Sequence, residues 1–283
     1  LSAGWGKRLN WPDDYFQLSA ELSYQRYILK DWQYFPVTNG KCNDLSIGLT
    51  LARASYDNPI YPRSGSDFSL SVQFTPPYSL FDGVDYSKYN EYNQNDMNKM
   101  HKWVEYHKWK FKAKTYIPLL NPTVVKKTPV LMTRVEFGIL GHYNKYKKSP
   151  FGTFDVGGDG TTGYSSYATE SVALRGYENS SLTPYRGQEG YAYTRIGFEL
   201  RYPLMLETST NIYALTFLEA GNAWHDVKNF NPFDLKRSAG VGVRIFLPMI
   251  GMMGIDWAYG FDKVLGDKSA GGSRFHFVLG QEF

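Results

Sequence analysis

The chain has 283 residues, enough for one large domain or two ordinary ones, and 17% of them are aromatic. Its formal net charge is only +4, which gives no electrostatic argument for a nucleic-acid partner, and its single cysteine, Cys42, excludes an internal disulfide. No uninterrupted apolar run is long enough for a membrane-spanning helix, but a transmembrane barrel needs none, because only every second residue of its strands faces lipid.

Apolar residues alternate with polar or small ones along most of the chain, which is the pattern of a β-strand with two different faces. In chain order, the segments with this pattern are 1–6, 16–25, 45–52, 67–74, 108–117, 131–139, 192–201, 211–221, 238–247, 253–261 and 273–283. No segment has the spacing of a convincing amphipathic helix. The sequence therefore predicts an all-β chain with eleven strands.

The two faces of these strands differ in a way that favours a membrane. One face is apolar and ends in aromatic residues, whereas the other carries Gly beside Ser, Glu, Lys or Arg, as the wall of a water-filled lumen would. A soluble β-sandwich also alternates, but its apolar face would point inward and its strands would be shorter. We therefore predict a transmembrane antiparallel up-and-down β-barrel, with the sandwich as the alternative.

The connections between the predicted strands form two classes. Those after the odd-numbered strands are short, and those after the even-numbered strands are longer and polar, like the periplasmic turns and extracellular loops of bacterial outer-membrane barrels. The longest connection, 143–190, is rich in Gly, Ser, Thr and Tyr, and a loop of this length in a compact domain is usually functional or disordered. Because eleven is odd and lipid cannot accommodate an open sheet edge, we expect further barrel strands outside this chain.

A four-residue motif in this loop carries a family resemblance. Leu174-Arg175-Gly176-Tyr177 resembles the Val-Arg-Gly-Phe motif in the sixth extracellular loop of the BamA family of outer-membrane protein assembly factors, and Gly157-Gly158 resembles the Gly-Gly before that motif. Asp57 followed by Pro62-Arg63-Ser64-Gly65 is similar to a short periplasmic turn of the family, and the terminal Phe283 to its targeting signal. By strand order, the chain resembles the C-terminal part of that family's barrel. The resemblance implies a 16-stranded barrel, with about five strands and the periplasmic POTRA domains upstream of Leu1.

The resemblance also implies a lock between the loop and the barrel wall. Arg175 would reach into the lumen and bond to Glu199 and Glu219, which lie on the lumen faces of the two strands after the loop. Phe217 would pack beside the guanidinium. Without the motif, both acids would be interpreted as residues that line water.

The last strand, 273–283, would form one side of a lateral seam. We expect its apolar residues to face lipid and its polar ones the lumen; these are Phe275, Phe277 and Leu279, and Arg274, His276 and Glu282. Gly280 can kink the strand near its end, and a loosely paired edge offers N–H and C=O groups to an incoming strand. The implied function is to fold and insert barrel proteins in the bacterial outer membrane. Its partners would be unfolded outer-membrane proteins, accessory assembly lipoproteins, and outer-membrane lipid or lipopolysaccharide.

No catalytic or metal-binding constellation is evident in the sequence. The five histidines show no metal spacing with Cys42, no nucleophile elbow occurs, and no Gly-Lys-Ser/Thr follows the glycines at 157–160. We therefore expect neither enzyme activity nor a cofactor or metal. The lysines between 108 and 114 could bind phosphate or lipopolysaccharide, although a charge run is more often a solvated face. Two other classes of function stay open: a passive porin or polypeptide-secretion pore of the same superfamily, and a barrel enzyme such as a lipase.

Overall fold

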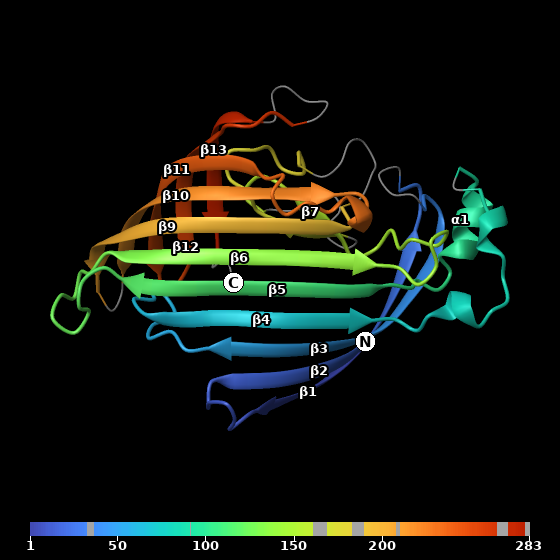
Figure 1. Cartoon of the computed structure of the whole chain (residues 1–283), viewed down its shortest axis with the longest axis horizontal. Helices are drawn as coiled ribbons and strands as arrows, with labels where there is room; N and C mark the ends of the chain where they lie inside the picture. The colour runs from blue at the N-terminus through green and yellow to red at the C-terminus, as the bar shows by residue number, and fades with distance from the viewer. Residues whose placement is uncertain are drawn as a thin grey trace.

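The computed structural model describes residues 1–32, 37–90, 92–160, 169–182, 190–207, 210–264 and 271–280. Within them, eleven strands form one antiparallel sheet in chain order, from β1 (Ser2–Arg8) to β13 (Gly272–Leu279), which confirms the predicted all-β up-and-down arrangement (Figure 1). The strands between these two are β2 (Phe16–Leu29), β3 (Gly40–Ala54), β4 (Gly65–Phe74), β5 (His107–Pro118), β6 (Val130–Gly141), β9 (Ala192–Leu206), β10 (Asn211–Trp224), β11 (Lys236–Leu247) and β12 (Gly251–Gly260). Several strands are longer than predicted, because the pairing continues into segments without strict alternation.

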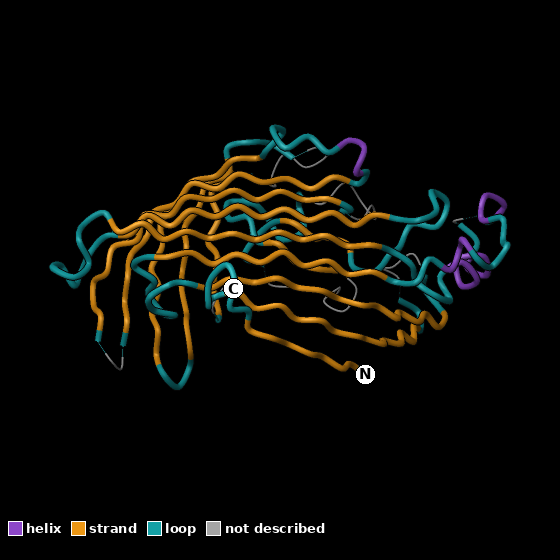
Figure 2. Tube along the Cα trace, turned by 60° about the horizontal axis from the view of Figure 1, so that its bottom comes forward, coloured by secondary structure: helices purple, strands orange, loops and turns teal. Residues whose placement is uncertain are grey.

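The sheet is strongly curved, and its two edges are β1 and β13. In Figure 1 the strands from β4 to β9 run side by side, and the sheet then turns so that β12 and β13 lie behind them at a steep angle. Figure 2 shows the same curvature from another side. Within the described residues the sheet is not closed, since β1 pairs only with β2 and β13 only with β12.

The burial of the strands is inverted relative to a soluble protein. On β10 the inward Glu219 is 3% exposed, whereas the outward Leu218 is 60% exposed. On β6 the inward Arg134 is buried and the outward Phe137 is exposed. Because water does not favour an apolar outer surface around a charged interior, this arrangement fits a wall that faces lipid outside.

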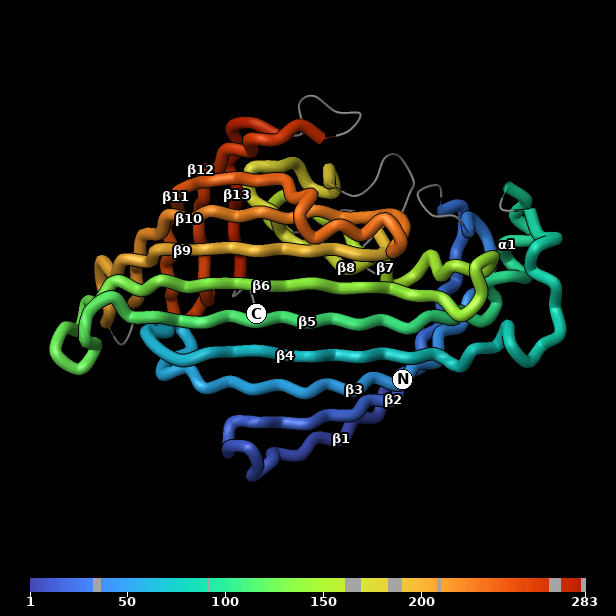
Figure 3. The backbone as a smooth tube through the Cα atoms, in the orientation of Figure 1, coloured from blue at the N-terminus to red at the C-terminus, as the bar shows by residue number. Residues whose placement is uncertain are grey.

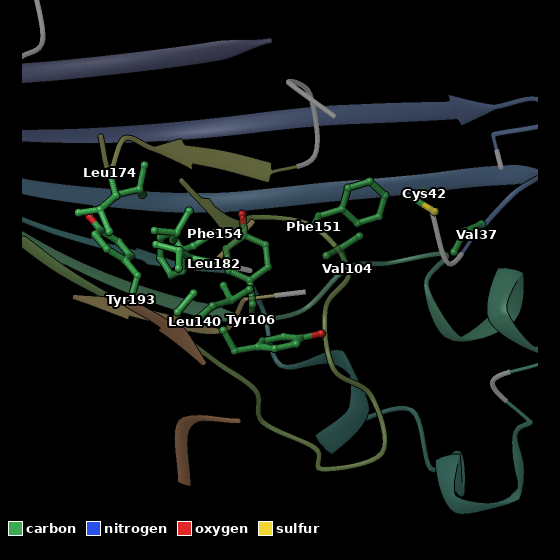
Figure 4. Packing of buried hydrophobic residues seen from close by; sticks show 14 of the residues in the cluster. Val37, Cys42, Val104, Tyr106, Leu140, Phe151, Phe154, Leu174, Leu182 and Tyr193 are labelled. Carbon is green, nitrogen blue, oxygen red and sulfur yellow. The ribbon is translucent and has the colours of Figure 1, made fainter. Parts of the chain in front are cut away.

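The long connection between β6 and β9 folds onto the concave, lumen-facing side of the sheet. It contains β7 (Thr153–Val156) and β8 (Thr169–Val172), which form a separate two-stranded parallel sheet (Figure 3). The main apolar cluster lies between this connection and the wall, with Phe154 and Leu174 from the connection packed against Leu140 and Tyr193 from the strands (Figure 4). The fixed position of the loop therefore rests on hydrophobic burial as well as on charge.

A short helix, α1 (Gln94–Met100), was not predicted from the sequence. It lies in the connection between β4 and β5, together with the 3₁₀ turns η1 (Tyr78–Leu80) and η2 (Tyr86–Lys88). The Asn93 side chain caps it by accepting a hydrogen bond from the backbone N–H of Asn95, and Met97 and Met100 are buried. Seven residues are too few for a clear helical period. A third 3₁₀ turn, η3 (Val227–Asn229), follows β10, and no helix in the described part of the chain is long and apolar enough to cross a membrane.

The lumen faces of β2, β3 and β4 are lined differently from those of β9 to β13. Here Ser, Thr and Gln side chains, with Lys108 and Lys110 of β5, surround an open hollow of about 290 Å³. The contacts of the four motif residues 174–177 with the wall, given below, are on β9 to β13. Elsewhere the long connection reaches β5 through Glu170 and β2 through Phe151, which stacks on Tyr27. The lumen face of the described chain is therefore filled beside β9 to β13 and polar and open around this hollow.

Candidate functional site

The motif loop begins where β8 ends, at Val172. Backbone hydrogen bonds join this start of the loop to the segment at Gly157-Gly158. Leu174 N donates to Gly158 O (3.1 Å), and Gly157 N donates to Val172 O (3.0 Å). Gly158 has φ +71°, and a Cβ there would overlap the Asn179 side chain, so glycine lets the two limbs of the loop meet. The pair Gly157-Gly158 thus supports the backbone directly ahead of Arg175.

Arg175 bonds to three buried carboxylates on three strands. Its Nη2 donates to Glu199 Oε1 of β9 and to Glu219 Oε1 of β10, each at 2.7 Å, and its Nη1 donates to Asp256 Oδ2 of β12 at 3.1 Å. The backbone N–H of Arg175 also donates to Glu219 Oε2 (3.1 Å), and its Cζ lies 3.5 Å from the Phe217 ring centroid. The expected contacts with Glu199, Glu219 and Phe217 are therefore present, and Asp256 is an additional partner.

The three carboxylates are each held by a second arginine from the wall itself. The pairs are Glu199 with Arg201 (2.7 Å), Glu219 with Arg195 (2.8 Å) and Asp256 with Arg244 (2.6 Å). An unpaired buried charge costs several kcal/mol, whereas a network of paired charges distributes that cost over many bonds. Burial opposes the charge on Arg175, but Glu219 and Glu199 hold its pKa well above the ordinary value for arginine. Each of the three acids is thus held in place by a wall arginine, independently of Arg175.

The two motif residues after Arg175 attach the loop to further strands. Gly176 N donates to Nε2 of His276 on β13 (2.9 Å). The Tyr177 hydroxyl donates to Arg237 O on β11 (2.7 Å) and accepts a hydrogen bond from the backbone N–H of Asp262 (3.3 Å). Together with Leu174 in the apolar cluster, every motif residue has a distinct contact with the wall.

The predicted seam strand has the expected faces. β13 pairs with β12 from Gly272↔Gly260 to Leu279↔Met253. Phe275, Phe277 and Leu279 point outward and are 69%, 62% and 77% exposed, and His276 points inward and is buried. Gly280 follows with φ +88°, and its N–H donates to Met252 O at 2.7 Å. Phe283 and Glu282 lie outside the described residues, so the predictions about them stay predictions.

The lysine row on β5 has a partner that sequence reasoning missed. The Glu170 carboxylate of β8 forms ion pairs with Lys108 (2.8 Å) and Lys110 (3.0 Å), and Lys112 Nζ lies 4.0 Å from Glu170 Oε1. Burial alone would raise the pKa of Glu170, but the charges of Lys108 and Lys110 outweigh it and lower that pKa to about 2. This part of the row thus binds the loop.

Sequence reasoning also missed the roles of Asp256 and His276, because these roles depend on the register between neighbouring strands. Alternation already places Asp256 and His276 on the lumen face, but it does not say which level of the barrel they reach. In the structure Asp256 of β12 lies opposite His276 of β13 in the strand register, and Phe217 of β10 lies opposite Glu199 of β9. The predicted turn is formed as expected, with Arg63 Nε bonded to Asp57 Oδ2 at 2.9 Å.

Comparison with known proteins gives a family and a fold. The model of the Omp85 superfamily domain matches residues 2–283. Among solved structures, the crystal structure of BamA from Haemophilus ducreyi lacking POTRA domains 1-3 is similar, with a TM-score of 0.63 and 17% sequence identity. The match covers 98% of this chain and 52% of that one, so the chain spans about half the length of the crystallised chain that it matches. A search of curated proteins finds no match.

Proposed function

The chain belongs to the Omp85 superfamily, and from this premise we propose that it forms the C-terminal part of an outer-membrane barrel that folds and inserts other β-barrel proteins. Its fold resembles that of the BamA barrel, and its outer surface has the apolar character that lipid requires. Membership supports a place in outer-membrane protein assembly or transport, and the choice of assembly rests on the site.

The observation that carries the proposal is the way in which β13 is attached to the loop on one side and apolar on the other. Its inward side is attached to the motif loop and its outward side is apolar, so the strand is held from the lumen while its other face suits lipid. Where a barrel seam opens beside such a strand, its exposed edge can pair with an extended segment of another protein, and main-chain hydrogen bonds then supply the affinity. Pairing with a client strand would place that strand at the membrane boundary without a chemical reaction.

The substrates in this proposal are unfolded outer-membrane proteins, whose strands carry the same alternation as the wall. Contact with outer-membrane lipid follows from the outward faces of the strands. Accessory assembly lipoproteins and lipopolysaccharide stay predictions from the family resemblance.

The proposal can be tested by photo-crosslinking in the full-length protein that contains this chain. A photoreactive residue replaces Phe277 on β13 or, as a matched control, Phe137 on β6; both are outward aromatic residues. An unfolded barrel client is then added to the protein in lipid vesicles, and its folding is followed by protease protection.

We expect client adducts at position 277 and few at position 137, together with faster client folding than in empty vesicles. Equal labelling at both positions would contradict pairing at β13. Unchanged client folding, combined with ion conductance through the vesicle membrane, would instead indicate a pore.

A further inference from the structure

The last strand is held by more than its neighbour β12. Two side chains on its lumen face, two residues apart, contact two residues of the motif loop that are also two apart. His276 Nε2 accepts a hydrogen bond from Gly176 N–H at 2.9 Å, and Arg274 Nη2 lies 2.6 Å from Glu178 Oε1. Two contacts at matched spacing restrain both the position and the twist of the strand from its lumen side, whereas a single contact would restrain one point only.

The first contact requires glycine in the motif. Gly176 has φ +89°, and a Cβ at this position would lie 2.8 Å from Gly260 N and 2.9 Å from Ser238 Cβ. Only a residue without a side chain can bring its amide this close to β11 and β12, and this approach aims the N–H at β13. His276 is 6% exposed, so its ring nitrogen has little access to water as an alternative donor.

These contacts are linked to the arginine network through β12. Asp256, which accepts from Arg175, is the cross-strand partner of His276. Displacing the loop from the carboxylates would therefore also withdraw the amide from His276. The second contact is more accessible, since the Arg274 and Glu178 side chains are 29% and 46% exposed, and it can be altered without placing a charge in the interior.

We propose that the contacts Gly176–His276 and Glu178–Arg274 form a latch that holds β13 from the lumen side, so that the position of the motif loop controls how freely the edge of β13 takes a new strand partner. This β13 latch deepens the proposed function and rests on it for its biological meaning, but its existence as a mechanical link is independent of any client.

Charge reversal tests the latch in the full-length protein reconstituted in lipid nanodiscs. Arg274→Glu and Glu178→Arg each break the ion pair, and the double variant restores it with opposite polarity. Hydrogen exchange of the amides in 272–280 is compared with that of β9. We expect about fivefold faster exchange in each single variant, and a return towards the wild-type rate in the double variant.

A matched control reverses a surface pair that does not touch β13. Lys88→Glu breaks the ion pair with Asp85 in the β4–β5 connection (3.4 Å), in which the Lys88 side chain is 81% exposed. It should leave exchange in β13 unchanged. His276→Leu removes the acceptor of the first contact and should loosen β13, whereas His276→Gln, which keeps an acceptor oxygen, should restore part of the protection.

Two readouts separate failure of the latch from failure of the proposed function. Faster exchange in β13 without client folding by any form, wild type included, would overturn the assembly function and leave the latch intact. Client folding by the wild type, with β13 exchange unmoved by both single reversals and by His276→Leu, would overturn the latch. Lack of rescue in the double variant would also contradict it.

Discussion

Replacing Arg175 by alanine should release the motif loop while the wall keeps its structure. The substitution removes three charged hydrogen bonds, two of 2.7 Å and one of 3.1 Å, and the stacking on Phe217. Removing one partner of a buried ion pair typically costs about 3–5 kcal/mol, mainly because a charge is left alone. In this network each carboxylate keeps a wall arginine, so we expect the lower end of that range.

A loss of about 3 kcal/mol corresponds to an increase on the order of a hundredfold in the opening equilibrium of the loop. Hydrogen exchange of residues 172–178 measures that equilibrium, and migration of the unheated protein on a denaturing gel reports whether the barrel stays folded. Arg175→Lys should give an intermediate value, since one ammonium group cannot reproduce the planar fork that reaches three acids.

Lys88→Ala is the control for this experiment. It removes a cation whose side chain is 81% exposed and pairs with one surface acid, Asp85, which is worth at most about 1 kcal/mol. Two results would refute the reasoning: loop exchange in Arg175→Ala within about fivefold of wild type, or unfolding of the whole barrel. The first would mean that apolar packing alone docks the loop, and the second that the wall arginines do not hold the acids.

Three further predictions concern other parts of the loops. Gly176→Ala should loosen the motif loop by about 1–3 kcal/mol or more, measured by the same exchange, because an L-residue at φ +89° is strained and its Cβ would meet Gly260. Glu170→Gln should speed exchange in β8, because Lys108 and Lys110 lose their common anion; equal rates would show that the ion pairs do not dock β8. Burial and nearby Lys147 lower the pKa of His101 to about 3, so the neutral ring contributes stability fully above pH 6.5 and progressively less as the pH falls towards 3. Protease cleavage in the β4–β5 connection should therefore rise at pH 5, where the cost is about 2 kcal/mol, and should rise less in His101→Gln.

The strands could be predicted from the sequence because one repeated constraint sets them. Lipid outside and charge inside require opposite residues at successive positions, so even a weak signal in each strand becomes strong over eleven of them. The connections have no such constraint. α1 is held by its cap at Asn93 and by two buried methionines, and β7 and β8 have four residues each, too few to show a period.

The site was only partly predictable for the same reason. Arg175, Glu199 and Glu219 follow from the motif resemblance together with the face of each strand. Asp256 was assigned to the lumen face, but its contact with Arg175 depends on the stagger of four strands and on the depth to which the loop descends. Neither quantity is encoded in local alternation.

The unequal filling of the lumen face has a mechanical consequence. Where the loop joins β9 to β13 through ions, hydrogen bonds and apolar packing, bending the wall would break many contacts at once. Around the open hollow beside β2 to β4 the inner face is lined mainly by Ser, Thr and Gln with Glu21, so bending there would break fewer contacts with the loop. We therefore expect a force on this sheet to deform mainly the N-terminal strands. The strands that contact the motif loop should deform less and keep β13 at a constant angle to the membrane.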